Sequence, residues 1–218
     1  MLRYRSLLLV LLFAPAPLAS STPSTSEWAT LQSALSTNAS LHGPIESSTY
    51  DTECKTLGTN AYAISAGGNG ICMHAHDCSH EFCSPKSFGY DLPSYVADVR
   101  TEEDISAVLT FASTHSLEVS VKTTGHSYQG SSTKKSSLMV WMHFYPKDGT
   151  VQTEYVDSCG VARGPVLGIG GGETWDDVLE AVKDEYHIVT GGGRTVSAAG
   201  GWLMGGGLSF SSREYVRS

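Results

Sequence analysis

Two stretches of the chain carry the spacing of an amphipathic helix, each with a polar cap in front of it. Apolar residues recur at i, i+3, i+4 and i+7 over residues 105–112 and again over residues 175–182, which is the period of a helix with one buried face. The runs follow Thr101–Asp104 and Thr174–Asp177, two capping boxes in which a hydroxyl and a carboxylate bond the first backbone groups of a helix. A shorter helix is expected over residues 28–35. The apolar positions that predict these three helices are Trp28, Leu31, Leu35, Ile105, Val108, Leu109, Ala112, Trp175, Val178, Leu179 and Val182.

Short apolar or alternating runs predict the strands. Tyr95–Val99 precedes the first capped helix, and Leu117–Thr123 follows it with apolar side chains at every second position. We therefore expect Leu117, Val119 and Val121 to lie on one buried face of a strand. Further strands are expected over residues 137–144 and 150–156, over 166–169 as a buried strand, and over 187–190. The order strand, helix, strand thus occurs twice.

Two glycine-rich loops follow predicted strands, Thr123–Gly130 and Gly191–Gly207. Eight of the seventeen residues in the second loop are glycine, against about 7% in an average protein. Glycine main chain can turn with positive φ or approach another group closely, and its N–H groups can wrap a pyrophosphate. A flexible linker has a similar composition, but a linker does not need the apolar Val196, Trp202 and Leu203 that interrupt the second loop. We interpret both loops as candidate binding loops.

Neither loop contains a familiar nucleotide or hydrolase motif. The nearest approach to Gly-x-Gly-x-x-Gly, at Gly168–Gly170, has Glu173 where the third glycine belongs. The Gly-Lys-Ser/Thr ending of a phosphate loop is absent from the sequence. The stretch Gly125–Gln129 lacks the last glycine of a nucleophile elbow. A dinucleotide would therefore be held in a different way.

The overall composition is that of an acidic globular protein. The chain has 218 residues, 40% of them hydrophobic, with no repeat, which is typical of one domain or two small ones. Lys and Arg number 14 against 22 Asp and Glu, a formal net charge of -8. This charge argues against a nucleic acid partner, because binding to nucleic acid depends on basic residues. Charged residues make up only 17%, below the ~25% of an average soluble domain, as is common among exported proteins.

The first twenty residues have the layout of a secretory signal peptide. Arg3 and Arg5 precede the apolar run Leu7–Ala14, and small residues follow it. This run is too short to cross a bilayer, which requires about 20 apolar residues. We therefore expect a secreted protein without a membrane anchor; an uncleaved N-terminal helix is the alternative. Asn38 begins the sequon Asn-Ala-Ser, which predicts a glycoprotein.

Residues 21–90 form a Ser-, Thr- and Cys-rich segment with little periodicity. Four of the five cysteines lie in it, at Cys54, Cys72, Cys78 and Cys83. In an oxidising compartment they can form two disulfides, in any of three pairings. The alternative is a zinc or copper site that also uses nearby histidines, which are His74, His76 and His80. Cys159 stands apart and is expected to be buried or disulfide-bonded.

The two glycine-rich loops and the residues between them resemble the FAD-linked oxidases of the vanillyl-alcohol oxidase and p-cresol methylhydroxylase (PCMH) superfamily, particularly the branch that contains berberine bridge enzyme. The motifs that carry the resemblance are Lys122–Gly130, Gly171–Val178 and Val189–Gly207, and the whole match covers roughly residues 93–216. The resemblance implies an α+β fold, a PCMH-type FAD-binding domain of two small α/β subdomains. This domain is expected at residues 91–218, after a signal peptide at 1–20 and the loop-rich cysteine-containing segment at 21–90.

The resemblance also implies how FAD is held. In relatives with a Gly-His-x-Tyr motif the histidine is joined covalently to the 8α-methyl group of FAD, which makes His126 the expected attachment residue; a neutral imidazole is a competent nucleophile. The residues expected to contact FAD are Thr124, Gly125, His126, Ser127, Tyr128, Gly130, Gly192, Gly193, Thr195, Val196, Gly200 and Gly201. Many relatives add a second bond through a cysteine in the later loop, where this chain has Gly193 and Arg194. A single covalent bond, through His126, is therefore expected.

The implied function is that of the FAD-binding portion of a secreted flavin-dependent oxidoreductase. Such an enzyme oxidises an alcohol, a sugar or a similar small molecule by hydride transfer to FAD, with O2 as the expected electron acceptor. Relatives continue into more FAD domain and a substrate domain, so the domain is expected to be incomplete at Ser218, with the catalytic base outside this chain. The alternative is a non-catalytic product, either a truncated flavin-domain remnant or a secreted binding module stapled by disulfides.

Overall fold

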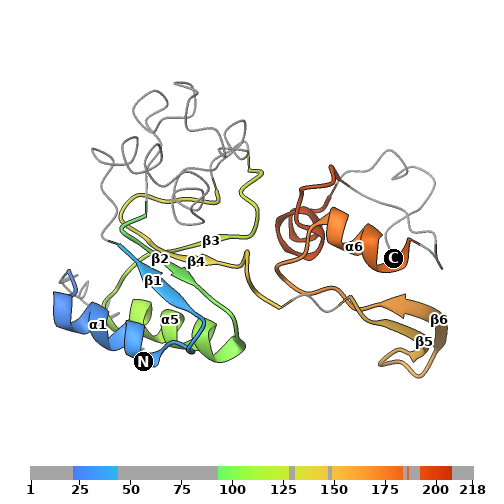
Figure 1. The fold of residues 1–218 in the computed structure, drawn as a ribbon, viewed down its shortest axis with the longest axis horizontal. Coiled ribbons are helices and arrows are strands. Elements are labelled where there is room, and N and C mark those ends of the chain that lie inside the picture. Colours follow the sequence, from blue (N-terminus) through green and yellow to red (C-terminus); the bar gives the residue numbers. More distant parts are fainter. Residues whose placement is uncertain are drawn as a thin grey trace, which may run out of the picture.

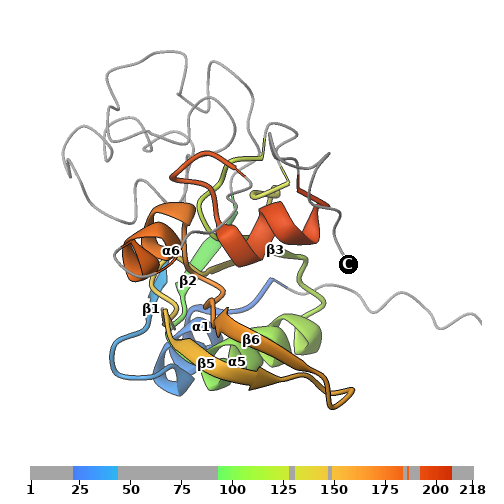
Figure 2. The same ribbon diagram turned by 90° about the vertical axis from the view of Figure 1, so that its right-hand side faces the viewer.

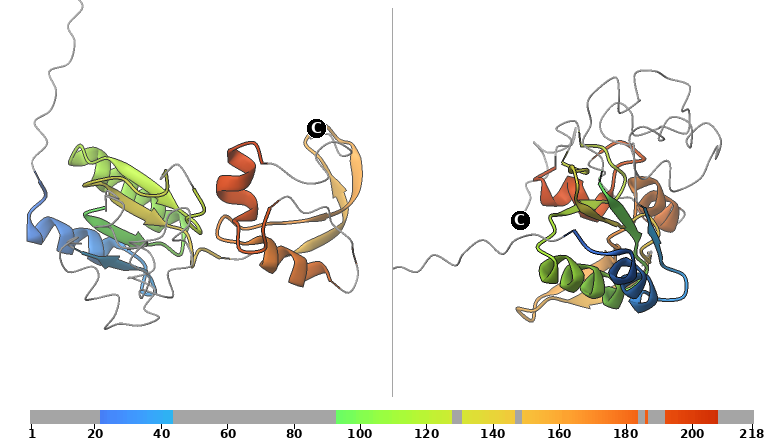
Figure 3. Two further views of the ribbon diagram at one scale, coloured as in Figure 1. Left: turned by 90° about the horizontal axis from the view of Figure 1, so that it is seen from above. Right: turned by 90° about the vertical axis from the view of Figure 1, so that its left-hand side faces the viewer.

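The computed structural model describes residues 22–43, 93–127, 131–146, 149–183, 186 and 192–207. These residues form two lobes that stand side by side (Figure 1; Figure 3). We call the described parts of residues 22–146 the first lobe and those of residues 149–207 the second lobe. The signal peptide expected at 1–20, the cysteine and histidine cluster of residues 54–83 and the strand expected at 187–190 lie outside the described residues.

The first lobe is a four-stranded sheet with two helices on one of its faces (Figure 1). Across the sheet the strands are, in order, β1 (Ser40–His42), β2 (Tyr95–Asp98), β4 (Leu138–Trp141) and β3 (Val119–Lys122). The strands β2, β4 and β3 are parallel, and β1 pairs antiparallel with β2. The helices are α1 (Thr25–Ala34) and α5 (Glu102–Thr114), and α5 connects β2 to β3. The short helix, the first capped helix and the first three strands expected from the sequence are confirmed.

The two helices and the sheet enclose one core. Its buried side chains include Trp28, Leu31, Val108, Ala112, Leu138 and Val140. Trp28 of α1 also stacks on Tyr95 of β2, with ring centroids 3.8 Å apart. Residues 22–43 therefore supply a helix and an edge strand to the same helix-and-sheet unit as residues 93–146. From the sequence we expected residues 21–90 to form a separate segment before the domain.

The helix α5 buries a polar residue in its apolar stripe. Asp104, Val108 and Ala112 are buried, whereas Leu109, expected in the core, is 46% exposed. The carboxylate of Asp104 accepts four hydrogen bonds, from the backbone N–H groups of Ser36 (2.7 Å), Arg100 (2.9 Å) and Thr101 (3.0 Å) and from the Ser36 hydroxyl (2.9 Å). Asp104, whose partner Ser36 follows the end of α1, therefore belongs to the buried stripe of α5, and Leu109 lies outside it.

The expected burial of β3 is wrong at the end of the strand. Val121 is 56% exposed, whereas Ser120 and Lys122, on the other face of the strand, are buried. β3 is an edge strand, and the core covers Val119 at its start but not Val121. Alternation of apolar residues in a sequence indicates which residues share one face of a strand. It does not indicate how far along that face the covering helices extend.

The second lobe combines a hairpin, a helix and a helical turn (Figure 2). The elements are β5 (Val151–Val156), antiparallel β6 (Ala162–Leu167), α6 (Trp175–Val182) and the π-helical turn η3 (Ala198–Trp202). Trp175, Val178 and Ala198 are buried together, and Trp202 packs edge-on against Trp175 with ring centroids 5.3 Å apart. The strand over 150–156, the second capping box and its helix are confirmed, and so is the mixed α+β character of the fold.

The hairpin differs from the sequence expectation in two ways. The strand expected to be buried at 166–169 begins at Ala162 instead and has no buried residue. Cys159, expected to be buried or disulfide-bonded, has an exposed free thiol in the turn between β5 and β6. Both differences arise because most of the hairpin extends away from α6 (Figure 1), and of its strand residues only Leu167, at the end of β6, packs against the core of the second lobe.

Candidate functional site

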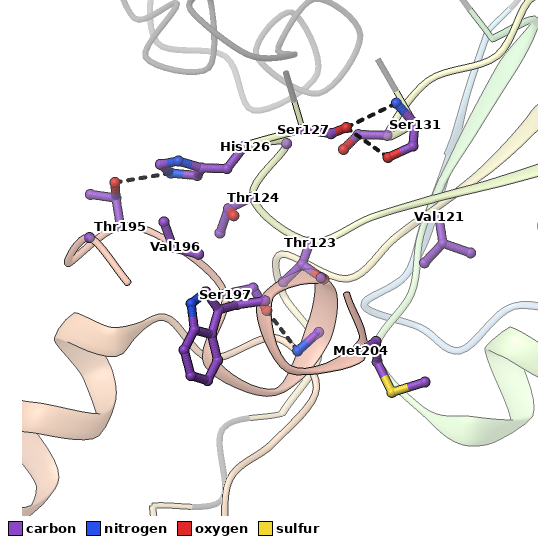
Figure 4. Close-up of a pocket in the computed structure, with 16 residues that line it drawn as sticks. Val121, Thr123, Thr124, His126, Ser127, Ser131, Thr195, Val196, Ser197 and Met204 are labelled. Carbon is purple, nitrogen blue, oxygen red and sulfur yellow. Dashed lines mark hydrogen bonds between the residues drawn. The ribbon is translucent and has the colours of Figure 1, made fainter. Parts of the chain in front are cut away.

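A cleft with a volume of about 880 Å³ lies between the two lobes (Figure 4). One wall is the loop that follows β3, and the other is the glycine-rich loop of the second lobe. The residues that line it are Val121, Thr123, Thr124, Gly125, His126, Ser127, Ser131, Ser132, Gly193, Thr195, Val196, Ser197, Gly200, Gly201, Trp202 and Met204. Seven of these described residues carry a hydroxyl group, and none is Asp, Glu, Lys or Arg. The cleft wall is therefore neutral and rich in hydroxyl groups.

The first wall is shaped by a glycine turn directly after β3. Gly125 is buried and has φ +81°, a left-handed conformation that glycine adopts without a steric penalty. The turn directs the side chain of His126 toward the second lobe (Figure 4). Ser127 holds the end of this loop, because its Oγ accepts hydrogen bonds from the backbone N–H (3.1 Å) and the hydroxyl (2.7 Å) of Ser131.

The second wall begins with a turn that is fixed to the start of α6. The N–H groups of Trp175 and Asp176, in the first turn of α6, donate to the carbonyl oxygens of Val196 (3.0 Å) and Arg194 (2.8 Å). The Arg194 guanidinium also donates from Nε to the Asp176 carboxylate, at 2.6 Å. Because the first N–H groups of a helix need partners outside the helix, the turn caps α6 while α6 fixes the turn. The main chain of Thr195, between the two accepting residues, is therefore held in place.

The turn η3 continues this wall and is anchored by Glu173. The Ser197 hydroxyl oxygen accepts the N–H of Gly200 at 3.0 Å, and the N–H of Ala198 donates to the backbone carbonyl of Glu173 at 2.9 Å. Glu173 is buried, and its carboxylate accepts the N–H of Gly170 at 2.6 Å. The Gly-Gly-Glu-Thr-Trp motif thus ties the loop before α6 to the glycine-rich loop after it.

The two walls meet at two points. Nε2 of His126 lies 3.0 Å from Oγ1 of Thr195, 69 residues further along the chain. A β-carbon placed on Gly200 would lie 2.8 Å from Oγ1 of Thr123, so the main chain of one loop passes directly over a side chain of the other. The two glycine-rich loops of the sequence therefore converge on one cleft.

Most of the residues expected to contact FAD line this cleft. They are Thr124, Gly125, His126, Ser127, Gly193, Thr195, Val196, Gly200 and Gly201. Gly192 does not line it: a β-carbon there would lie 3.2 Å from Cδ1 of Trp202, so the packing of that ring explains the glycine. Tyr128 and Gly130 lie outside the described residues.

The cleft also contains residues that were not selected from the sequence. These are Val121, Thr123, Ser131, Ser132, Ser197, Trp202 and Met204. Val121 was assigned to the core, and its position at the end of a strand that runs into a glycine loop is the signal that could have identified it. Trp202 and Met204 belong to the apolar residues that interrupt the second loop, and Met204 is 84% exposed.

The lining groups fit FAD. The cofactor combines an anionic pyrophosphate with a flat apolar ring system, and the described cleft wall has no carboxylate that would repel the phosphates. A β-carbon placed on Gly201 meets no atom within 4 Å, so bare main chain faces open space there and can approach a ligand closely. Val121, Trp202 and Met204 offer apolar surface for the ring, and the His126 imidazole stands in the same cleft.

The described residues contain neither a cluster of metal-binding side chains nor a membrane-spanning helix. No group of three or more His, Cys, Asp and Glu side chains is placed there to hold a metal ion. Among the helices described, none combines the length and the apolar character needed to cross a membrane.

Comparison with known sequences places these residues among flavoproteins. A family model described as "FAD binding domain" matches residues 93–217. "FAD-linked oxidoreductase apf9" of Gibberella fujikuroi is 38% identical over 122 residues, which are 54% of this chain and 21% of that protein. "VAO-type flavoprotein oxidase VAO615" of Thermothelomyces thermophilus is 35% identical over 126 residues, 56% of this chain and 21% of that protein. The chain therefore spans about a fifth of the length of these two relatives.

Comparison with solved structures shows a similar fold. The crystal structure of the VAO-type flavoprotein MtVAO615 from Myceliophthora thermophila C1 has a TM-score of 0.66 and 25% identity, and the match covers 91% of this chain and 39% of that chain. The VAO-type flavoprotein MtVAO713 from the same organism has a TM-score of 0.61 at 23% identity, over 83% of this chain and 35% of that chain.

Proposed function

The chain belongs to the family of proteins with this FAD binding domain, which includes FAD-linked oxidoreductases, and from this premise we propose that it holds FAD covalently in the cleft between its lobes, as the cofactor-binding part of a secreted oxidoreductase. The resemblance to the vanillyl-alcohol oxidase and PCMH superfamily and the PCMH-type α+β fold are confirmed. The covalent bond, the export, the substrate and the electron acceptor belong to the proposal.

One contact is the main support for assigning the cleft as the FAD site. His126 and Thr195 lie on different lobes, and their side chains meet at 3.0 Å across the cleft. The imidazole therefore stands beside the glycine main chain of the second loop, within one neutral, hydroxyl-lined space. In this proposal the main chain of Gly125–Ser127 binds the pyrophosphate, and the apolar surface of Trp202 contacts the ring system.

FAD, when bound, supplies the acceptor for a hydride taken from the substrate, and O2 is the proposed final acceptor. The residues of this chain bind and orient the cofactor. His126 contributes an imidazole nitrogen that forms a C–N bond to the 8α-carbon, which prevents loss of the cofactor outside the cell. We propose an alcohol, a sugar or a similar small molecule as the substrate.

Export is supported by the accessibility of the glycosylation sequon. Asn38 is exposed in the turn between α1 and β1, so an oligosaccharide can be attached there without disturbing the core. An accessible Asn-x-Ser sequon is expected of a protein that passes through a lumenal compartment. Together with the signal peptide expected at residues 1–20, it supports a secreted glycoprotein.

Intact-mass measurement of the chain secreted from a eukaryotic host tests the proposal. We expect the mass of one FAD to remain on the protein after denaturation, and the adduct to be found on the peptide that contains His126. His126→Ala should abolish the adduct while leaving reversible FAD binding measurable. A colourless wild-type protein with two disulfides and no flavin would refute the proposal and support a disulfide-stapled binding module instead.

A further inference from the structure

The main chain around Thr195 is a fixed platform on one side of the cleft. The carbonyl groups on either side of it, those of Arg194 and Val196, accept N–H groups from the first turn of α6 at 2.8 and 3.0 Å. The ion pair between Arg194 and Asp176 adds a third tie between the turn and the helix. The hydroxyl of Thr195 therefore has a defined position relative to α6, and it is exposed to the cleft.

The imidazole of His126 approaches this platform from the other lobe. It extends from a loop that turns at Gly125, and its Nε2 lies 3.0 Å from the Thr195 oxygen. A histidine side chain turns about two single bonds, so a hydrogen bond at Nε2 restricts both rotations. A neutral imidazole has one N–H and one lone pair, and the Thr195 hydroxyl can donate or accept, so the bond fixes the orientation of the ring in either tautomer. With Nε2–H donating to Thr195, the lone pair lies on the other ring nitrogen.

We infer that Thr195 is a positioning residue for covalent attachment of the flavin: it holds the His126 imidazole in the rotamer that can form the bond. The inference rests on the function proposed above. Attachment replaces a C–H bond of the 8α-methyl group by a C–N bond to His126, and one proton leaves the carbon and one leaves the ring. The two electrons released pass through the flavin to O2, which becomes H2O2. A nucleophile that is oriented by a neighbouring group reacts faster because less rotational freedom is lost on the way to the transition state.

The inference is tested with the full chain and FAD, by measuring acid-stable and total bound flavin over time. Thr195→Val removes the hydroxyl and should slow attachment, measured per molecule of bound FAD, by roughly tenfold to a hundredfold. Thr195→Ser keeps the hydroxyl and should restore attachment. Thr153→Val, at an exposed position of β5 outside the cleft, is the matched control and should attach flavin at the wild-type rate.

Three outcomes overturn the inference while leaving the proposed function intact. The first is attachment by Thr195→Val at the wild-type rate. The second is a Thr195→Ser variant as slow as Thr195→Val. The third is a deficit in Thr195→Val that disappears when attachment is measured per molecule of bound FAD, which would mean that the hydroxyl acts on binding alone. Three-bond couplings about χ1 of His126 in the FAD-free chain give an independent check: one rotamer is expected in wild type and averaging over rotamers in Thr195→Val, and identical couplings would contradict the inference. Flavin bound by wild type but attached at another residue would refute the proposed function itself.

Discussion

Gly200 approaches Thr123 so closely that a β-carbon on the glycine would lie 2.8 Å from the threonine Oγ1. The same β-carbon would lie 2.6 Å from the Oγ of Ser197, which accepts the N–H of Gly200. The glycine therefore stands where the loops of the two lobes touch, and its lack of a side chain lets them come together. This contact and the one between His126 and Thr195 together define how the lobes enclose the cleft.

A methyl group at position 200 should push the loops apart. Gly200→Ala forces both hydroxyl oxygens to move, and overpacking of this kind costs about 1 to 3 kcal/mol. We expect a lower free energy of unfolding in urea and less bound flavin in the same variant. The matched control is Gly201→Ala in the FAD-free chain, because a β-carbon there meets no atom within 4 Å. Equal stability of the two variants would contradict the steric role of Gly200.

Substitution of Gly201 tests whether the cofactor contacts the main chain at a position without a side chain. Since a β-carbon on Gly201 projects into open space beside the cleft, Gly201→Ala should keep wild-type stability within about 0.5 kcal/mol. If the cofactor approaches the main chain at this point, the methyl group should lower FAD affinity by roughly tenfold, since about 1.4 kcal/mol of lost contact corresponds to that factor. Fluorescence titration with FAD measures the change, and an unchanged affinity would show that the cofactor does not reach Gly201.

The local signals in the sequence predicted the elements and the loops, because they act over a few residues. Both capping boxes, Thr101–Asp104 and Thr174–Asp177, form with the hydroxyl and the carboxylate in their expected roles. The glycine-rich loops were recognised from composition and from their position after strands. Their convergence could be expected only through the family resemblance, since no local pattern relates His126 to Thr195.

What the sequence did not predict depends on contacts between distant parts of the chain. The carboxylate of Asp104 serves the capping box and also binds Ser36, 68 residues away. The exposure of Val121 depends on how far the core extends along an edge strand. Gly192 was assigned to the cofactor site, but it does not line the cleft, and a β-carbon there would lie 3.2 Å from Cδ1 of Trp202.

Asp104 should contribute strongly to the free energy of unfolding at pH values above the range in which its carboxyl group titrates. Burial raises the pKa of its carboxyl, but the hydrogen bonds from Ser36, Arg100 and Thr101 outweigh burial and hold the pKa below its ordinary value. A lowered folded-state pKa stabilises the protein above the unfolded pKa of about 3.9, and this contribution is lost as the pH falls through the folded value. Asp104→Asn should therefore lower the free energy of unfolding at pH 7 by about 2 to 4 kcal/mol.

The control for Asp104 is the neighbouring acidic residue Glu103, which is exposed on α5. Glu103→Gln should cost less than about 1 kcal/mol, the size of a helix-dipole effect at an exposed site. Urea unfolding at pH 7 and pH 3 separates the two. If Asp104→Asn and wild type lose stability in parallel between these pH values, the four hydrogen bonds do not favour the ionised carboxylate.

Lys122 should also make the stability of the protein rise with pH, but in a higher pH range than Asp104. It is 3% exposed on β3, and burial lowers the pKa of its ammonium group to about 7, against about 10.4 in an unfolded chain. Between these values the unfolded state binds more protons than the folded state, so stability rises with pH, by up to about 1.4 kcal/mol per pH unit. Lys122→Met should flatten this rise between pH 7 and pH 9 in urea unfolding, whereas Lys183→Met, at an exposed position of the second lobe, should keep it. Parallel curves for wild type and Lys122→Met would mean that the buried lysine keeps its proton in the folded chain, and that its own interactions offset the loss of water around the charge.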